Sequence, residues 1–102
     1  MAARPDDRSK RFFEKRGYLV GKTERRFGGF NHDLFGFVDL VAIAPGDTIG
    51  CQATSRSNVS ARVKKIQQHE NYQRVQDCGW RIVVHGWNPA KRGEEGLREE
   101  WL

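Results

Sequence analysis

The chain has 102 residues, the length of one ordinary domain, and we expect a single domain over residues 1–102. Its 37% hydrophobic and 30% charged residues are typical of a small folded domain and unlike a disordered tail. Eighteen Lys and Arg residues against 13 Asp and Glu residues give a formal net charge of +5. The sequence contains no apolar stretch long enough to span a bilayer and no signal peptide. We therefore expect a cytoplasmic protein that does not bind membranes.

The first half of the sequence predicts a helix followed by three strands. Asp6 or Asp7 can cap a helix that runs to about Arg16 and ends at Gly17. Three short apolar segments predict strands: one begins at Tyr18, the second covers residues 37–43 and the third covers residues 48–54. The Pro45-Gly46 pair predicts a tight turn, so the last two of these strands form an antiparallel hairpin.

The second half predicts a long helix and two further strands. A helix is expected from Ser57 or Asn58 to Cys78, with a weaker apolar pattern in its far half. Residues 80–86 predict an inner strand, and residues 97–101 predict an edge strand. The element order α-β-β-β-α-β, with an optional last strand, predicts an α/β fold in which helices flank a mixed β-sheet.

Some chemically reactive residues fit packing better than function. Cys51 and Cys78 lack the spacing of a zinc site, and we expect both to be reduced, partly buried packing residues. His85 is expected to be a hydrogen-bonded polar residue at an edge, and Trp87 to lie in the core. These residues are therefore not candidates for the site.

Basic residues gather in residues 4–26 and again around residues 56–65. Clusters of this kind favour binding to the nucleic-acid backbone, because each neutralised phosphate releases counterions. The alternative is a solvated surface with no partner. The residues expected to contact DNA are Lys22, Arg25, Arg26, Arg56, Arg62 and Lys64.

The hairpin predicts a polar pair at its open end. With the turn at residues 45–46, Ile43 faces Thr48 and Asp39 faces Gln52. Directly opposed residues project to the same face, with Cβ atoms about 5 Å apart. The two polar side chains should therefore converge, unless a one-residue bulge shifts the register.

Asp39 lies on a strand face that is otherwise apolar, where a carboxylate is costly unless it pairs with a cation. The alternative is that Asp39 lies in solvent or caps a loop. Asp33 supplies a second carboxylate from the same edge of the sheet. Two acids with the amide oxygen of Gln52 or a strand carbonyl would form an oxygen-rich site suited to Mg²⁺ or Mn²⁺.

The order of these motifs resembles the PD-(D/E)XK nuclease superfamily, and within it the small Holliday-junction-resolvase-like or phage-type members. The resemblance rests on residues 33–40, on Gln52-Ala53-Thr54-Ser55, on residues 62–66 and on the strand at residues 83–87. It covers most of the chain, with Gln-x-Thr in place of Glu-x-Lys. It implies a restriction-endonuclease-like core and metal-dependent hydrolysis of DNA phosphodiester bonds.

The resemblance also implies a metal site and an acid on the first helix. Asp39 would be the central metal ligand, Gln52 would take the place of the second acid, and the Ala53 carbonyl would complete the contacts to the metal. Asp33 would be a further ligand. Glu14 corresponds to the first-helix acid, and the alternative is that it is a surface residue of a charged helix.

The main departure from the superfamily pattern is at Thr54, which occupies the position of the catalytic lysine and has no positive charge. Lys65 or Lys64 on the following helix would have to supply that charge, with a long stem reaching inward. Helix geometry places Arg62 closer than Lys65 to the buried stripe that contains Ile66.

The implied partners are branched or duplex DNA and a second copy of the chain, because cleavage of a four-way junction needs two coordinated cuts. A phage-encoded protein would act in the host cytoplasm. Three alternatives remain: a nicking or repair nuclease of the same fold, a restriction-like endonuclease, and a catalytically degenerate DNA-binding domain.

Overall fold

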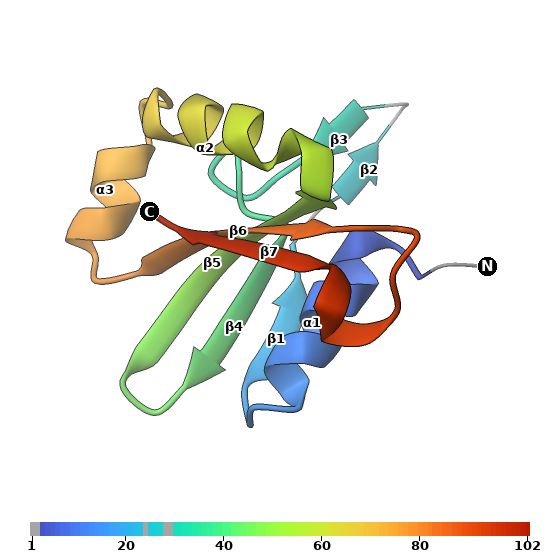
Figure 1. The fold of residues 1–102 in the computed structure, drawn as a ribbon. Helices are drawn as coiled ribbons and strands as arrows, with labels where there is room; N and C mark the ends of the chain where they lie inside the picture. Colours follow the sequence, from blue (N-terminus) through green and yellow to red (C-terminus); the bar gives the residue numbers. More distant parts are fainter. Residues whose placement is uncertain (1–2, 24, 28–29) are drawn as a thin grey trace.

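The computed structural model describes residues 3–23, 25–27 and 30–102, although for residues 25–27 and 30–31 only the backbone is described. The helices are α1 (Pro5–Glu14), α2 (Val59–Gln67) and α3 (Tyr72–Asp77), with short 3₁₀ turns at Arg56–Asn58 and Gly93–Gly96. The strands are β1 (Leu19–Lys22), β2 (Arg25–Phe27), β3 (Phe30–His32), β4 (Leu40–Ala44), β5 (Asp47–Ser55), β6 (Arg81–Trp87) and β7 (Leu97–Trp101). The predicted mixed α/β class is confirmed (Figure 1).

The main sheet has five strands in the order β1-β4-β5-β6-β7. Strands β1, β4 and β5 are antiparallel neighbours, β5 and β6 are parallel, and β7 is antiparallel to β6. The α2–α3 segment makes the crossover that a parallel β5–β6 pair requires. The prediction that residues 97–101 form an edge strand is confirmed.

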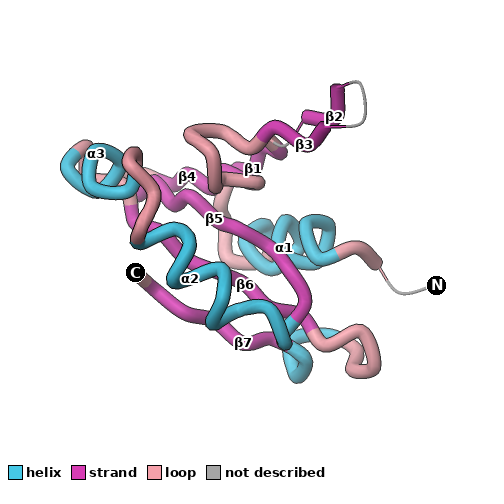
Figure 2. The backbone as a smooth tube through the Cα atoms, turned by 90° about the horizontal axis from the view of Figure 1, so that it is seen from above, coloured by secondary structure: helices cyan, strands magenta, loops and turns pink. Residues whose placement is uncertain are grey.

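The β2–β3 hairpin was not predicted. It follows β1 and forms a separate two-stranded sheet, which extends away from the main sheet in Figure 2. None of the described helices is both long and apolar enough to cross a membrane.

The inner part of the sheet is buried on both faces, because α1 covers one and α2 with α3 covers the other. Along β6, Val83 packs with Phe12 and Phe13 of α1, whereas Val84 packs with Val59 and Ile66 of α2. Alternate residues of β6 therefore face opposite layers, as its nearly continuous apolar sequence predicts.

Helix α1 begins one or two residues before the predicted caps. Pro5 occupies its first turn, where the missing N–H costs no helical hydrogen bond, so Asp6 and Asp7 lie inside the helix. The predicted stop at Gly17 is confirmed: its φ is 87°, and the following Tyr18 N–H donates to the Phe13 carbonyl at 3.1 Å.

The predicted helix from residue 57 or 58 to Cys78 is in fact two helices, broken at residues 68–71. His69 Nδ1 accepts the Asn71 N–H at 3.0 Å and so replaces a helical carbonyl. The His69 ring also fills the space beside Gly36, where an added Cβ would lie 2.3 Å from Nε2. A contact with a distant loop therefore explains the break.

The hairpin register is confirmed from Leu40, which pairs with Cys51, to Ala44, which pairs with Asp47. Strand β4 begins later than predicted, because residues 34–38 form a tight loop closed by the Leu34–Val38 bridge. Cys51 is buried as expected, whereas Cys78 is exposed at the end of α3.

Candidate functional site

A cavity of about 310 Å³ opens beside the carboxyl end of β5, where the start of α1, the loop before β4 and the first turns of α2 meet. It brings together six residues predicted from the sequence: Asp33, Asp39, Gln52, Ala53, Thr54 and Arg62. Arg4, Pro5 and Asp6 line it from the start of α1, and Ser55 lines it from the end of β5. The cavity is therefore polar and contains groups of both charges.

Asp39 is held firmly at the point where the chain enters β4. Its N–H donates to the Cys51 carbonyl at 2.9 Å, and its own carbonyl accepts the Thr23 N–H at 2.8 Å. The carboxylate is nearly buried, and its Oδ2 accepts the Ala53 N–H at 3.0 Å. The neighbouring strands thus fix both the backbone and the side chain of this acid.

Gln52 is also nearly buried, and its Nε2 donates to the Phe37 carbonyl at 3.1 Å. This bond fixes the planar amide, so the oxygen is the end that could coordinate a cation.

The predicted pairing of Asp39 with Gln52 in the β-ladder is wrong, because the Asp39 N–H bonds to Cys51 instead. The chain leaves the ladder there to form the loop of residues 34–38. Both side chains nevertheless line the same cavity, so they converge as predicted.

The basic residues of α2 lie differently around the cavity. Arg62 is half-buried and lines it, whereas Lys64 and Lys65 are exposed and are not among its lining residues. The helix geometry therefore predicted the position of Arg62 correctly. The role suggested for Lys65 requires its side chain to leave the conformation seen here.

Charges at the start of α1 are linked to β1. Lys22 forms ion pairs with Asp6, at 3.5 Å, and with Asp7, while Arg4 lies 3.5 Å from Asp6. The hydrogen bond from Lys22 lowers the pKa of Asp7, and the same bond raises the pKa of Lys22. Lys22 is thus engaged by protein carboxylates at the border of the cavity.

Other predicted site residues lie elsewhere. Glu14 is exposed at the far end of α1, about 12 Å along the helix axis from Asp6, so it is not grouped with the other acids. Arg56 is exposed in the turn after β5. Arg25 and Arg26 belong to β2, and their side chains lie outside the described residues.

The first-helix acid that does line the cavity is Asp6, to which the sequence analysis gave only a capping role. Its position in the first turn, between Pro5 and Asp7, was the available signal, because a helix N-terminus favours carboxylates. That signal could not show which part of the sheet the helix end would reach.

The donor set fits a hard divalent cation in its chemistry. Carboxylates, an amide oxygen and a backbone carbonyl are the ligands that Mg²⁺ and Mn²⁺ prefer. Among the described residues no three His, Cys, Asp or Glu side chains converge as a metal-binding group. A cation here would therefore depend on the Gln52 amide, on the Ala53 carbonyl, or on water to complete its coordination.

The cavity is lined both by oxygen ligands and by the arginines Arg4 and Arg62. Such a combination can hold a cation and a phosphate next to each other, because the ligands attract the cation and the guanidinium groups attract the anion.

Comparisons of the chain with protein-family models, with curated proteins and with solved structures find no match.

Proposed function

We propose that the protein is a metal-dependent DNA endonuclease, which hydrolyses phosphodiester bonds at this cavity with Mg²⁺ or Mn²⁺. The proposal depends on one observation: Asp39, at the entry to β4, lines one cavity with Gln52 and Ala53 of the neighbouring strand β5 and with Asp33. A bound divalent ion would supply activation of the attacking water and shielding of the phosphate charge.

The residues of the chain would hold and orient the reacting groups. Asp39, Asp33, the Gln52 amide and the Ala53 carbonyl would hold the ion. Arg62, half-buried at the cavity wall, would contact the phosphate and offset the negative charge that develops during hydrolysis.

The sheet topology supports a restriction-endonuclease-like core of the PD-(D/E)XK kind. An antiparallel β1-β4-β5 arrangement, a helical crossover and a parallel β6 are the α-β-β-β-α-β order that the resemblance implies. If the substrate is a Holliday-junction-like branched DNA, the active form would be a symmetric homodimer.

A second function is favoured by a different observation. Thr54 adds no charge, no lysine is among the described residues that line the cavity, and the Gln52 amide has a structural hydrogen bond to Phe37. These features suit a DNA-binding domain of the same fold that has lost catalysis.

We expect the protein to cleave DNA in Mg²⁺ or Mn²⁺ and to be inactive in EDTA, because the ion supplies the water activation that the chain lacks. A gel assay on four-way, flap, linear and single-stranded DNA measures both activity and substrate preference. Salt-sensitive binding without cleavage in either metal would favour the degenerate domain. Absence of both binding and cleavage would contradict both functions.

Arg62 and the neighbouring lysines should differ in their effects on cleavage. We expect Arg62→Gln to slow cleavage about a hundredfold, as for loss of a charge-stabilising donor. The double variant Lys64→Gln/Lys65→Gln, which changes only exposed groups, should weaken DNA binding about fivefold per charge at most. Single-turnover rates at saturating protein separate these effects. A greater loss of rate in the double variant would instead assign the missing lysine role to α2.

A further inference from the structure

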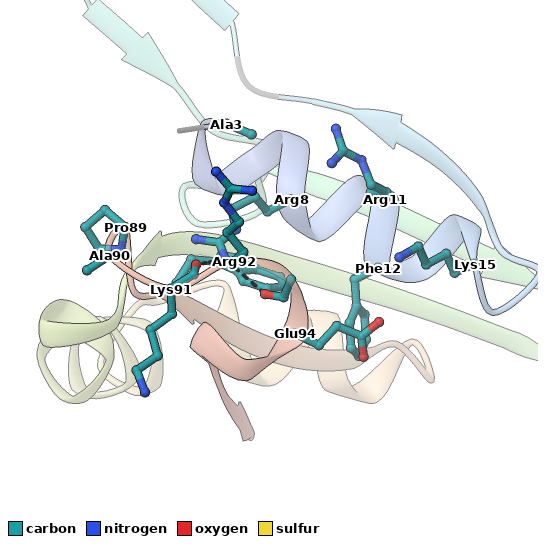
Figure 3. Close-up of a pocket in the computed structure, with 12 residues that line it drawn as sticks. Ala3, Arg8, Arg11, Phe12, Lys15, Pro89, Ala90, Lys91, Arg92 and Glu94 are labelled. Carbon is teal, nitrogen blue, oxygen red and sulfur yellow. Dashed lines mark hydrogen bonds between the residues drawn. The ribbon is translucent and has the colours of Figure 1, made fainter. Parts of the chain in front are cut away.

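A second cavity, of about 680 Å³, lies between α1 and the segment that follows β6 (Figure 3). Arg11 of α1 and Lys15, the residue after α1, are among its lining residues, and Lys91 and Arg92 line it from the facing segment. All four of these basic side chains belong to exposed residues. Neither the nuclease site nor the predicted DNA contacts include any of them.

Arg8 builds this cavity by fixing the segment opposite α1. Its guanidinium donates to the carbonyls of Asn88 (2.9 Å), Lys91 (2.7 Å) and Gly93 (2.9 Å). The same group lies over the Trp87 ring, 4.5 Å from its centroid. Arg8 is therefore a positioning residue, which presents Lys91 and its neighbour in a fixed arrangement.

The positive charge around the cavity is largely uncompensated. Within the described part of the chain, Arg11, Lys91 and Arg92 form no ion pair with a carboxylate. Glu94, the acid among the lining residues, is paired with Arg16 at 2.7 Å. An anion entering the cavity would thus meet exposed cations whose charge the protein does not neutralise.

The second cavity lies next to the candidate nuclease site. Ser55 lines the first cavity and Trp87 the second, and these residues are partners in the parallel β5–β6 pair. Neighbouring strands lie about 4.8 Å apart, so both cavities open at the same end of the sheet. The start of α1 contributes to both, through Ala3 to the second and Arg4 to the first.

We propose that the second cavity binds the sugar–phosphate backbone of the DNA that is cleaved at the first. This inference rests on the proposed function. Helix α1 has 10 residues and is about 15 Å long, whereas successive phosphates of one strand are about 3.4 Å apart along the duplex. The bound segment therefore lies a few nucleotides from the scissile phosphate, and its contacts are to phosphate rather than to bases.

The test compares Arg11→Gln, Arg92→Gln and their double variant with Arg74→Gln. Arg74 is exposed on α3, on the opposite face of the sheet, and its substitution removes the same charge. Affinity for a duplex of about 30 base pairs, longer than the 36 Å molecule, is measured by fluorescence anisotropy in Ca²⁺ at several salt concentrations. We expect each single cavity variant to bind about fivefold more weakly and to lower the salt slope by about one, and the double variant to lower the slope by about two.

Arg74→Gln should bind like wild type. The inference is overturned if the double variant has the affinity and salt slope of Arg74→Gln. That result would leave the proposed nuclease intact if wild type cuts DNA in Mg²⁺. Conversely, the expected loss of binding together with no cleavage in any metal would support the second cavity and overturn the nuclease function.

Discussion

Asp39→Asn should lower the rate of Mg²⁺-dependent DNA cleavage about a thousandfold, corresponding to about 4 kcal/mol of barrier. The substitution removes the negative charge expected to hold the ion. It keeps an oxygen that can accept the Ala53 N–H, which Asp39 Oδ2 now accepts at 3.0 Å. The fold and the affinity for DNA should therefore be retained. Single-turnover cleavage and anisotropy on the same preparation measure the two properties separately.

Glu70→Gln is the matched control for Asp39→Asn, because it removes one negative charge from an exposed residue outside the cavity. We expect it to cut DNA at the wild-type rate. Titration with Mn²⁺, followed by calorimetry, should show weaker metal binding in Asp39→Asn and not in Glu70→Gln. If Asp39→Asn cleaves like wild type, the reaction occurs at another site.

His85→Ala should destabilise the protein by about 3 kcal/mol or more, since it removes a fully buried ring from the core. The ring stacks on Phe13, with centroids 5.0 Å apart, and meets the edge of Phe12 at 4.9 Å. Its loss would also remove one hydrogen-bond partner from Ser9 and one from Glu99. Urea unfolding at pH 7.5 measures the change in the free energy of unfolding.

The hydrogen bonds around His85 form a chain that suits the neutral ring. Trp87 Nε1 donates to Ser9 Oγ at 2.8 Å, and Ser9 Oγ lies 2.9 Å from His85 Nδ1. His85 Nε2 lies 2.9 Å from Glu99 Oε2. If Nε2 carries the proton and donates to Glu99, the Ser9 hydroxyl donates to Nδ1 and every group is satisfied. Protonation of Nδ1 would require Ser9 Oγ to accept from both Trp87 and His85 and to turn its own proton to another acceptor.

Stability should consequently fall as the pH drops below the usual pKa of histidine. Burial lowers the pKa of His85, against the opposing effects of the hydrogen bond and charge of Glu99. The unfolded chain therefore binds a proton at a pH where the folded chain does not, so the contribution of His85 is present above about pH 6.5 and declines below it.

Urea unfolding at about pH 7.5, 6.5 and 5.5 tests this expectation, because these values bracket the usual pKa of histidine. His85→Gln is less stable at every pH, but its stability should change less between these values than that of wild type. The lowered pKa values of Asp7, Asp47 and Glu94 affect stability only at lower pH, as these carboxylates become protonated. Equal pH dependence in wild type and His85→Gln would show that the buried network does not control it.

Local signals predicted the parts of the fold that depend on neighbouring residues. The Pro45-Gly46 turn fixed the β4–β5 register from Leu40 to Ala44, and Gly17 closes the turn after α1 as expected, although the helix ends at Glu14 rather than near Arg16. These features could be predicted because turn chemistry and helix termination involve residues a few positions apart.

Contacts between distant residues caused the errors. His85 was expected at a strand edge, but α1 covers it, and no local pattern shows which helix packs on which strand. The break after α2 depends on the contact of His69 with Gly36. Asp6 reaches the cavity, and Glu14 does not, because the sheet determines where each end of α1 lies. The sequence thus predicted which types of side chain form the candidate site more easily than which positions supply them.

The bonds of Arg8 to Asn88, Lys91 and Gly93 join parts of the chain that are 80 to 85 residues apart. During synthesis, these partners leave the ribosome long after α1, since translation proceeds at about 5–20 residues per second. All lining residues of the nuclease cavity have left the ribosome once Arg62 has emerged, whereas the second cavity also needs Glu94. The second cavity is consequently assembled after the nuclease cavity, and a nascent chain cannot hold DNA there before Glu94 has emerged.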